Sequence, residues 1–217
     1  MRFETPNGSF EAIPVQVVVA GWTGRDASAV EHHIKELAAI GVSPPSRVPL
    51  FYRVSADLLT QSDTLEVLGP DTSGEVEPLV LSTGDALYLG LASDHTDRAL
   101  EVASVAASKQ ACGKPVARKI WPLDEVADHL DMLQLTTDIE ENGAWVRYQD
   151  GTLAAIRPLT ELIAEAALAD GSAMLCGTLA AIGGVRAASR YRMSLIDPVL
   201  SRKITLEYTV RTLPVVA

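Results

Sequence analysis

The 217-residue sequence contains only two cysteines, Cys112 and Cys176. A secreted domain held together by disulfides would carry more cysteines in a shorter chain. Two cysteines so far apart in the sequence cannot form a structural zinc site by themselves. We therefore interpret both as small hydrophobic residues without a chemical role.

The sequence also lacks a surplus of basic residues and any long apolar run. Lys and Arg number 18 against 28 Asp and Glu, a formal net charge of −10, which argues against extended contact with a nucleic-acid backbone. No segment approaches the roughly 18 uncharged apolar residues of a membrane span. Residues 1–4 do not begin the apolar stretch of a signal peptide. These absences predict a cytoplasmic protein with neither nucleic-acid nor membrane partners.

The sequence does contain enough apolar residues for a sizeable core, since 47% are hydrophobic and 21% are charged. The length fits one domain, or one domain with a small appendage. Prolines gather in the segment 42–49, which predicts an extended crossing. This crossing divides an N-terminal strand and helix (1–49) from the main β-rich region (50–217).

Hydrophobic periodicity predicts mainly short strands with a few helices. Helices are expected at 26–37, 96–109, 122–130 and 158–168, and strands at 13–20, 64–68, 76–82, 86–92, 132–138, 144–149, 191–196 and 203–212. Asn142-Gly143 predicts a hairpin turn between two of these strands. Strands and helices do not alternate regularly, which argues against a Rossmann sheet or a β/α barrel. The prediction is a β-rich α+β fold.

Three carboxylates occupy positions where they could meet. Glu75 and Glu77 point to the same face of a predicted strand, because alternate residues share a face. Asp94 follows the next apolar strand and precedes a helix. The two glutamates could instead lie on a solvated strand face, and Asp94 could cap the helix. If the three converge, their oxygens suit Mg²⁺, Mn²⁺ or Ca²⁺ rather than zinc.

The order of several motifs resembles the fumarylacetoacetate hydrolase superfamily. The motifs are Glu75-Val-Glu77, Asp94-His-Thr-Asp-Arg98, Lys109, Tyr148–Ile163 and Leu175–Gly183, with a proline-rich approach at Pro44–Leu59. The resemblance covers roughly residues 15–213 and indicates a divergent branch of the superfamily. It implies a mixed β-roll of the type found in the family's C-terminal domain. It also implies a divalent cation, Mg²⁺ or Mn²⁺ with Ca²⁺ as an alternative, on Glu75, Glu77 and Asp94.

The resemblance further implies which residues meet the substrate. Lys109 corresponds to the family lysine, whose ammonium pairs with a carboxylate or enolate oxygen. Gly177 and Thr178 match the loop that faces the substrate. Arg98 aligns with the family arginine, which could be structural instead. Tyr52, which follows the proline-rich crossing, is a candidate substrate contact.

A His-x-x-Glu pair in many family members acts as a base toward water, and this chain has His33-Ile-Lys-Glu36. The spacing places both side chains on one helix face. The alternative is a solvated polar face, for which the neighbouring residues Glu31, His32 and Lys35 are evidence. The family's proline after Gly-Thr is replaced by Leu179.

The function expected from this resemblance is a metal-dependent hydrolase. It would cleave a C–C bond in a small acylpyruvate-like, 1,3-dicarbonyl or 2-oxo acid substrate through a metal-stabilised enolate. A 2-oxo acid decarboxylase and a hydratase or tautomerase remain as alternatives, as does a non-catalytic family member that binds a ligand. The resemblance also implies a homodimer, and the apolar segment Ala173–Val185 is a candidate surface between subunits.

Overall fold

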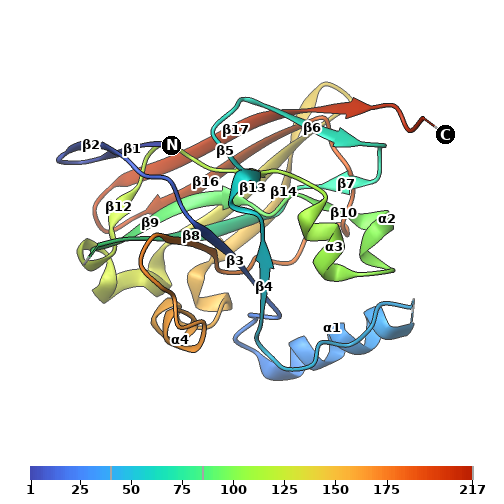
Figure 1. The fold of residues 1–217 in the computed structure, drawn as a ribbon, viewed down its shortest axis with the longest axis horizontal. Coiled ribbons are helices and arrows are strands. Elements are labelled where there is room, and N and C mark those ends of the chain that lie inside the picture. Colours follow the sequence, from blue (N-terminus) through green and yellow to red (C-terminus); the bar gives the residue numbers. More distant parts are fainter. Residues whose placement is uncertain (40, 85, 217) are drawn as a thin grey trace.

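The computed structural model describes residues 1–39, 41–84 and 86–216, and most of its strands belong to two sheets (Figure 1). The larger sheet has six strands in the order β12-β9-β8-β15-β3-β4. Their bounds are β3 Gln16–Gly21, β4 Leu50–Val54, β8 Val76–Thr83, β9 Ala86–Ser93, β12 Trp121–Pro122 and β15 Ser172–Leu175. The second sheet has five strands in the order β14-β13-β16-β17-β6. Their bounds are β6 Thr64–Leu68, β13 Gln134–Glu141, β14 Ala144–Thr152, β16 Arg190–Asp197 and β17 Arg202–Leu213.

Short pairs of strands and a few helices complete the described part of the chain. The strand pairs are β1 Arg2–Thr5 with β2 Gly8–Glu11, β5 Leu59–Thr60 with β11 Lys114–Pro115, and β7 Thr72–Ser73 with β10 Thr96–Asp97. The α-helices are α1 Ala27–Ala39, α2 Arg98–Glu101, α3 Val105–Gln110 and α4 Leu159–Glu165. Single 3₁₀ turns cover Ala56–Leu58, Leu123–Glu125, Ala127–Met132 and Leu153–Ala155. The fold is therefore a β-rich α+β fold, as the sequence predicts.

Both faces of the six-stranded sheet are buried. Val76 and Val80 of β8 pack into a core shared with the five-stranded sheet, which contributes residues such as Leu135. Leu79 and Leu81, which point to the opposite face, pack with Phe3 of the N-terminal hairpin. This burial explains why β8 is a nearly continuous apolar run rather than an alternating one.

Several predicted elements are confirmed within a few residues, including α1, β6, and the β13–β14 hairpin, whose turn residues Asn142 and Gly143 both have positive φ. The continuous helix predicted over 96–109 is wrong. A strand residue pair and two short helices occupy this segment, because extended Ser104 caps α3 by accepting a hydrogen bond from the Ala107 amide. The helix predicted at 122–130 consists of 3₁₀ turns.

Three strands of the larger sheet, β4, β12 and β15, and the β1–β2 hairpin were not anticipated as strands. Ala173, Met174 and Leu175 of β15 have no exposed surface, because β15 lies between β3 and β8. The first three residues of the segment Ala173–Val185 therefore belong to the protein's own core and cannot serve as a subunit surface. Within the residues the structure describes, no helix is both long and apolar enough to cross a membrane.

Candidate metal centre

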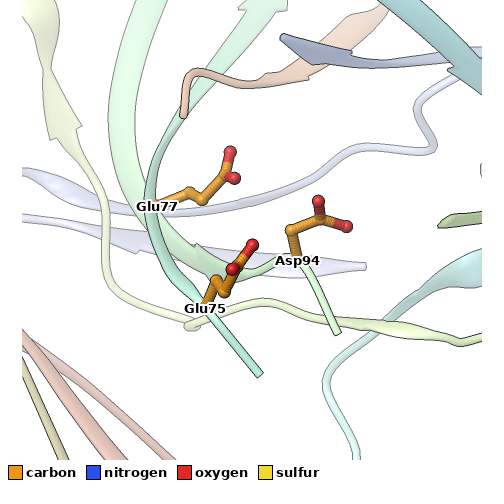
Figure 2. A group of neighbouring side chains, drawn as sticks. All are labelled: Glu75, Glu77 and Asp94. Carbon is orange, nitrogen blue, oxygen red and sulfur yellow. The ribbon is translucent and has the colours of Figure 1, made fainter. Parts of the chain in front are cut away.

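The three carboxylates singled out in the sequence lie together at one end of the β8–β9 hairpin. One oxygen from each of Glu75, Glu77 and Asp94 lies within 4.8 Å of the others, and Figure 2 shows the three side chains pointing into a shared space. Two oxygens bound to one cation at roughly 2.1–2.4 Å can be at most about 4.8 Å apart. The separation therefore fits a single bound cation.

Strand register brings these residues together. Val76 pairs with Ser93 and Glu77 with Ala92 in the antiparallel β8–β9 ladder, so the start of β8 meets the end of β9. The Asp94 amide then donates to the Glu75 carbonyl at 2.9 Å, which continues the pairing beyond the strands. Of the three side chains, Glu77 and Asp94 are buried, whereas Glu75 is 17% exposed. The site is thus open to solvent on the side of Glu75.

Two buried lysines flank Asp94. Lys109 of α3 pairs with Asp94 Oδ2, and Lys114 Nζ lies 3.0 Å from Asp94 Oδ1 and donates to the His95 carbonyl at 2.5 Å. Burial alone would raise the pKa of Asp94, but the two ammonium groups outweigh it and hold that pKa below its usual value. Lys109 could be identified from the sequence, whereas Lys114 belongs to none of the family-like motifs and was missed.

Glu77 is in a different electrostatic position. Its carboxylate accepts a hydrogen bond from the Gly177 amide at 2.7 Å. Burial, together with repulsion from Asp94, raises the pKa of Glu77 well above its usual value. The buried Asp94 Oδ1 has no well-aligned hydrogen-bond donor among the described residues. A divalent cation would stabilise the charged form of Glu77 and would give Asp94 Oδ1 a partner. An all-carboxylate donor set suits Mg²⁺, Mn²⁺ or Ca²⁺. The residues therefore fit such an ion.

Arg98 is held by the acidic groups around it. Its guanidinium lies 2.9 Å from Glu75 and 3.0 Å from Glu101, and its Nε donates to Ser73 at 2.7 Å. Burial would lower the pKa of Arg98, but the two glutamates raise it further above its usual value. In this arrangement Arg98 fixes the orientation of Glu75.

The Gly177–Thr178 loop packs against the start of β8. Gly177 has φ of +103°, and a Cβ there would lie 1.6 Å from the Thr23 hydroxyl, so only glycine fits. Thr178 Oγ1 donates to the Val76 carbonyl at 2.7 Å. Val76 lies between Glu75 and Glu77 in the sequence, so this hydrogen bond fixes the loop beside both glutamates.

Gln149 of β14 ties these segments together, and sequence reasoning did not single it out. Its side-chain oxygen accepts from the Val76 amide and the Thr137 hydroxyl, both at 3.0 Å. Its side-chain nitrogen donates to Thr178 Oγ1 at 2.8 Å and to the Leu179 carbonyl at 2.7 Å. The only sequence signal was its place within the family-like stretch Tyr148–Ile163.

The predicted dyad lies outside this cluster. His33 and Glu36 are 3.6 Å apart on α1, with side chains 61% and 60% exposed, and Glu36 also lies 3.2 Å from His32. In Figure 1, α1 runs along one side of the protein away from both sheets. The structure therefore does not bring the dyad to the triad.

Two aromatic residues lie between α1 and the triad. The His33 ring centroid is 5.9 Å from that of Trp22, and the Trp22 indole donates to the Tyr52 hydroxyl at 3.1 Å. Lys109 Nζ lies 5.7 Å from the centroid of the Tyr52 ring. Tyr52, the candidate substrate contact, thus borders the triad through Lys109.

Comparisons with known proteins identify the family of the chain and support its fold. The family model described as "Protein of unknown function (DUF2848)" matches residues 20–208. The search of curated proteins found no match. Among solved structures, a candidate fumarylacetoacetate isomerase/hydrolase from Oleispira antarctica has a TM-score of 0.71 and 18% identity, covering 97% of this chain and 100% of that chain.

Two further solved structures share the fold. A candidate fumarylpyruvate hydrolase from Burkholderia cenocepacia has a TM-score of 0.66 and 18% identity, covering 98% of this chain and 95% of that chain. A 2-keto-3-deoxy-D-arabinonate dehydratase complexed with magnesium and 2,5-dioxopentanoate has a TM-score of 0.65 and 15% identity, covering 94% and 75%. The resemblance to the fumarylacetoacetate hydrolase superfamily is confirmed at the level of the fold.

Proposed function

The chain belongs to the family described as protein of unknown function DUF2848, and we propose that it is a divalent-metal-dependent enzyme acting on a small 2-oxo acid. The specific reaction we propose is hydrolysis of a C–C bond in an acylpyruvate-like or 1,3-dicarbonyl substrate. The observation that carries the proposal is the convergence of Glu75, Glu77 and Asp94 within 4.8 Å. The magnesium-bound dehydratase with the same fold supports it.

In this proposal the three carboxylates hold Mg²⁺ or Mn²⁺, with Ca²⁺ as an alternative. When bound, the cation supplies Lewis-acid polarisation of the substrate's 2-oxo group. The charge of the site favours such a substrate. Counted with Glu101, which also pairs with Arg98, four carboxylates face the three cations Lys109, Lys114 and Arg98, so one of the two charges of the metal is unbalanced. The carboxylate of a 2-oxo acid would balance it.

The chain's own residues would orient the substrate. Lys109 supplies an ammonium beside Asp94, and the Tyr52 ring centroid lies 5.7 Å from that ammonium. Gly177 and Thr178 present a rigid loop next to Glu77. Hydrolysis of a 2,4-dioxo acid adds water across the C3–C4 bond and yields a carboxylic acid and pyruvate. A base must therefore take a proton from that water, and His33 with Glu36 is the proposed base.

A second reaction class is favoured by the exposure of this dyad. A 2-oxo acid decarboxylase, or a dehydratase or tautomerase, needs no water deprotonated by His33. The 61% exposure of the His33 side chain and its separation from Asp94 by Trp22 and Tyr52 favour such a reaction. The two candidates share the metal-binding carboxylates and differ in their need for the dyad.

The metal site is tested first. Metal content of the purified protein and a Mn²⁺ titration followed by thermal unfolding should show a raised melting temperature, because an ion that binds the folded state stabilises it. Glu77→Gln should abolish this stabilisation. Glu66→Gln, an exposed glutamate on β6, is the matched control and should respond like the wild type. Persistence of the stabilisation in Glu77→Gln would show that the triad is not the site.

The reaction class is tested with His33→Ala. For a hydrolase, turnover of an acylpyruvate should fall on the order of 10²–10⁴-fold, the usual contribution of a general base. His32→Ala removes the adjacent exposed imidazole and should leave turnover unchanged. Oxaloacetate is assayed in parallel as a decarboxylase substrate. Normal acylpyruvate turnover by His33→Ala would exclude this route and favour the second class.

Two architectural proposals accompany the function. We propose that the sheets form the family's mixed β-roll and that residues 1–49 and 50–217 fold as one unit, because β3 lies between β4 and β15. We also propose a two-fold homodimer. Since Ala173–Leu175 is buried, its contact would use the later part of the apolar segment, where Ile182 and Val185 are 51% and 52% exposed.

A further inference from the structure

A cavity of about 310 Å³ lies between the proline-rich segment 43–46, strand β4 and the α2–α3 connection. Two of its lining residues contact the partners of the triad. Glu101 pairs with Arg98, which pairs with Glu75, and Tyr52 places its ring 5.7 Å from Lys109 Nζ. The cavity therefore borders the residues that pair with Glu75 and Asp94.

The lining of this cavity is neutral or acidic. The twelve described residues that form it are Ser43, Pro44, Pro45, Ser46, Leu50, Tyr52, Glu101, Val102, Ala103, Ser104, Val105 and Ala106. None of these twelve is Lys, Arg or His, and one is a glutamate. Arg47, adjacent to the lining, stacks its guanidinium 5.5 Å from the Phe51 ring centroid. The neighbouring cations Arg98 and Lys109 are already paired with carboxylates.

This composition discriminates between tails of a substrate. An alkyl or hydroxyalkyl tail can pack against the proline, alanine and valine side chains, and burial of its apolar surface would contribute favourable binding free energy. A terminal carboxylate in the same place would lose solvation and face Glu101, and no cation is among the residues that line the cavity. The volume suits a short chain, since pockets for drug-sized ligands begin near 300 Å³.

We propose that this cavity receives the uncharged tail of the substrate, so that the enzyme takes monocarboxylic 2-oxo acids with a short neutral side chain rather than dicarboxylic ones. The inference rests on the proposed function, because the 2-oxo acid end must be held at the triad. It makes Ser46, Glu101 and Val105 part of the specificity-determining surface.

Binding tests this without knowledge of the reaction. Isothermal titration of the Mn²⁺-loaded protein compares pyruvate, 2-oxohexanoate and 2-oxohexanedioate, the last two differing only in the terminal carboxylate. 2-Oxohexanoate should bind at least ~10-fold more tightly than 2-oxohexanedioate, the discrimination expected when a charge is left unpaired. It should also bind more tightly than pyruvate, which has no comparable tail.

A matched pair of variants tests whether the lining of this cavity causes the preference for an uncharged tail. Ser46→Lys places a cation on the lining and should narrow or reverse the preference for 2-oxohexanoate. Ser46→Gln adds similar bulk without charge and should keep that preference. The inference would be overturned if the wild type bound 2-oxohexanedioate as tightly as 2-oxohexanoate or more tightly. It would also be overturned if Ser46→Lys and Ser46→Gln changed the preference between these two acids equally. In either case, binding of pyruvate would still support the proposed function. Absence of binding by all three acids to Mn²⁺-loaded protein would overturn the proposed function and the inference with it.

Discussion

Replacing Gln149 by leucine should show how much the hydrogen bonds that support the metal site contribute to stability and to metal binding. Gln149 has no exposed surface, and its amide makes four hydrogen bonds, to the Val76 amide, the Thr137 hydroxyl, Thr178 Oγ1 and the Leu179 carbonyl. Leucine has nearly the same volume but no polar atom. The variant therefore leaves these four groups without their partner and opens little space.

The magnitude follows from the partners that are stranded. A buried polar group without a partner costs about 1–3 kcal/mol. Thr178 Oγ1 keeps its bond to the Val76 carbonyl, so the loss should be smaller than four full penalties. We expect the free energy of unfolding to fall by roughly 3–5 kcal/mol, a large share of the 5–15 kcal/mol typical of a domain.

The same change should weaken metal binding. Val76 separates Glu75 from Glu77, and Gln149 fixes its backbone amide. Groups that orient metal ligands typically contribute about 10–100-fold in affinity, so Mn²⁺ binding should weaken by that amount. Thr137→Val is the control, since it removes one of the four bonds and leaves the bond between the Val76 amide and Gln149 in place. It should cost about 1 kcal/mol and leave Mn²⁺ affinity unchanged.

Urea unfolding at pH 7 and Mn²⁺ titration measure the two effects independently. If Gln149→Leu loses less than about 1 kcal/mol and binds Mn²⁺ like the wild type, the amide network does not support the site. A loss of Mn²⁺ affinity in Thr137→Val as large as in Gln149→Leu would also refute the reasoning. It would mean that the network acts through general stability and not through the Val76 amide.

Two further predictions concern stability and assembly. Burial would raise the pKa of Asp197, but the Leu200 amide, His129 and Arg202 outweigh it and lower that pKa. A lowered folded-state pKa stabilises the protein above the unfolded-state value, and this contribution is lost as the pH falls from about 5 through the folded-state value. Asp197→Asn should therefore lower the free energy of unfolding by about 2 kcal/mol at pH 7. In urea unfolding at pH 3–7, the free energy of unfolding of the variant should fall less steeply than that of the wild type as the pH is lowered. An equally steep fall in both proteins would exclude Asp197 as the cause of the acid dependence. Light scattering at micromolar concentration should give twice the 23.1 kDa chain mass, and a monomeric mass would remove the homodimer proposal.

The metal ligands could be predicted from sequence because they depend on local rules. Strand alternation places Glu75 and Glu77 on one face, and an antiparallel hairpin returns the chain to Asp94. The interruption of the helical pattern within 96–109 could not be predicted in the same way. The apolar spacing is helical throughout, but the Ser104 hydroxyl competes for the Ala107 amide and starts a new helix there.

The supporting residues could not be predicted, because their positions depend on long-range packing. Nothing near Lys114 in the sequence indicates burial, and burying an ammonium is tolerated only once Asp94 stands opposite it. Gln149 likewise acquires its role from segments 73 and 29 residues away. The strand β15 was missed because a four-residue strand has too few residues to reveal its period.

The position of β3 in the larger sheet has a consequence for how the chain folds. Val17 of β3 pairs in parallel with Ala173 of β15, and Thr64 of β6 pairs in parallel with Thr209 of β17. Both sheets thus need partners about 150 residues further along the chain, and such distant contacts slow folding. During synthesis, β3 keeps one edge unpaired until residues 172–175 have emerged. Throughout that interval, Val17, Val18 and Val19 present an apolar, aggregation-prone strand edge.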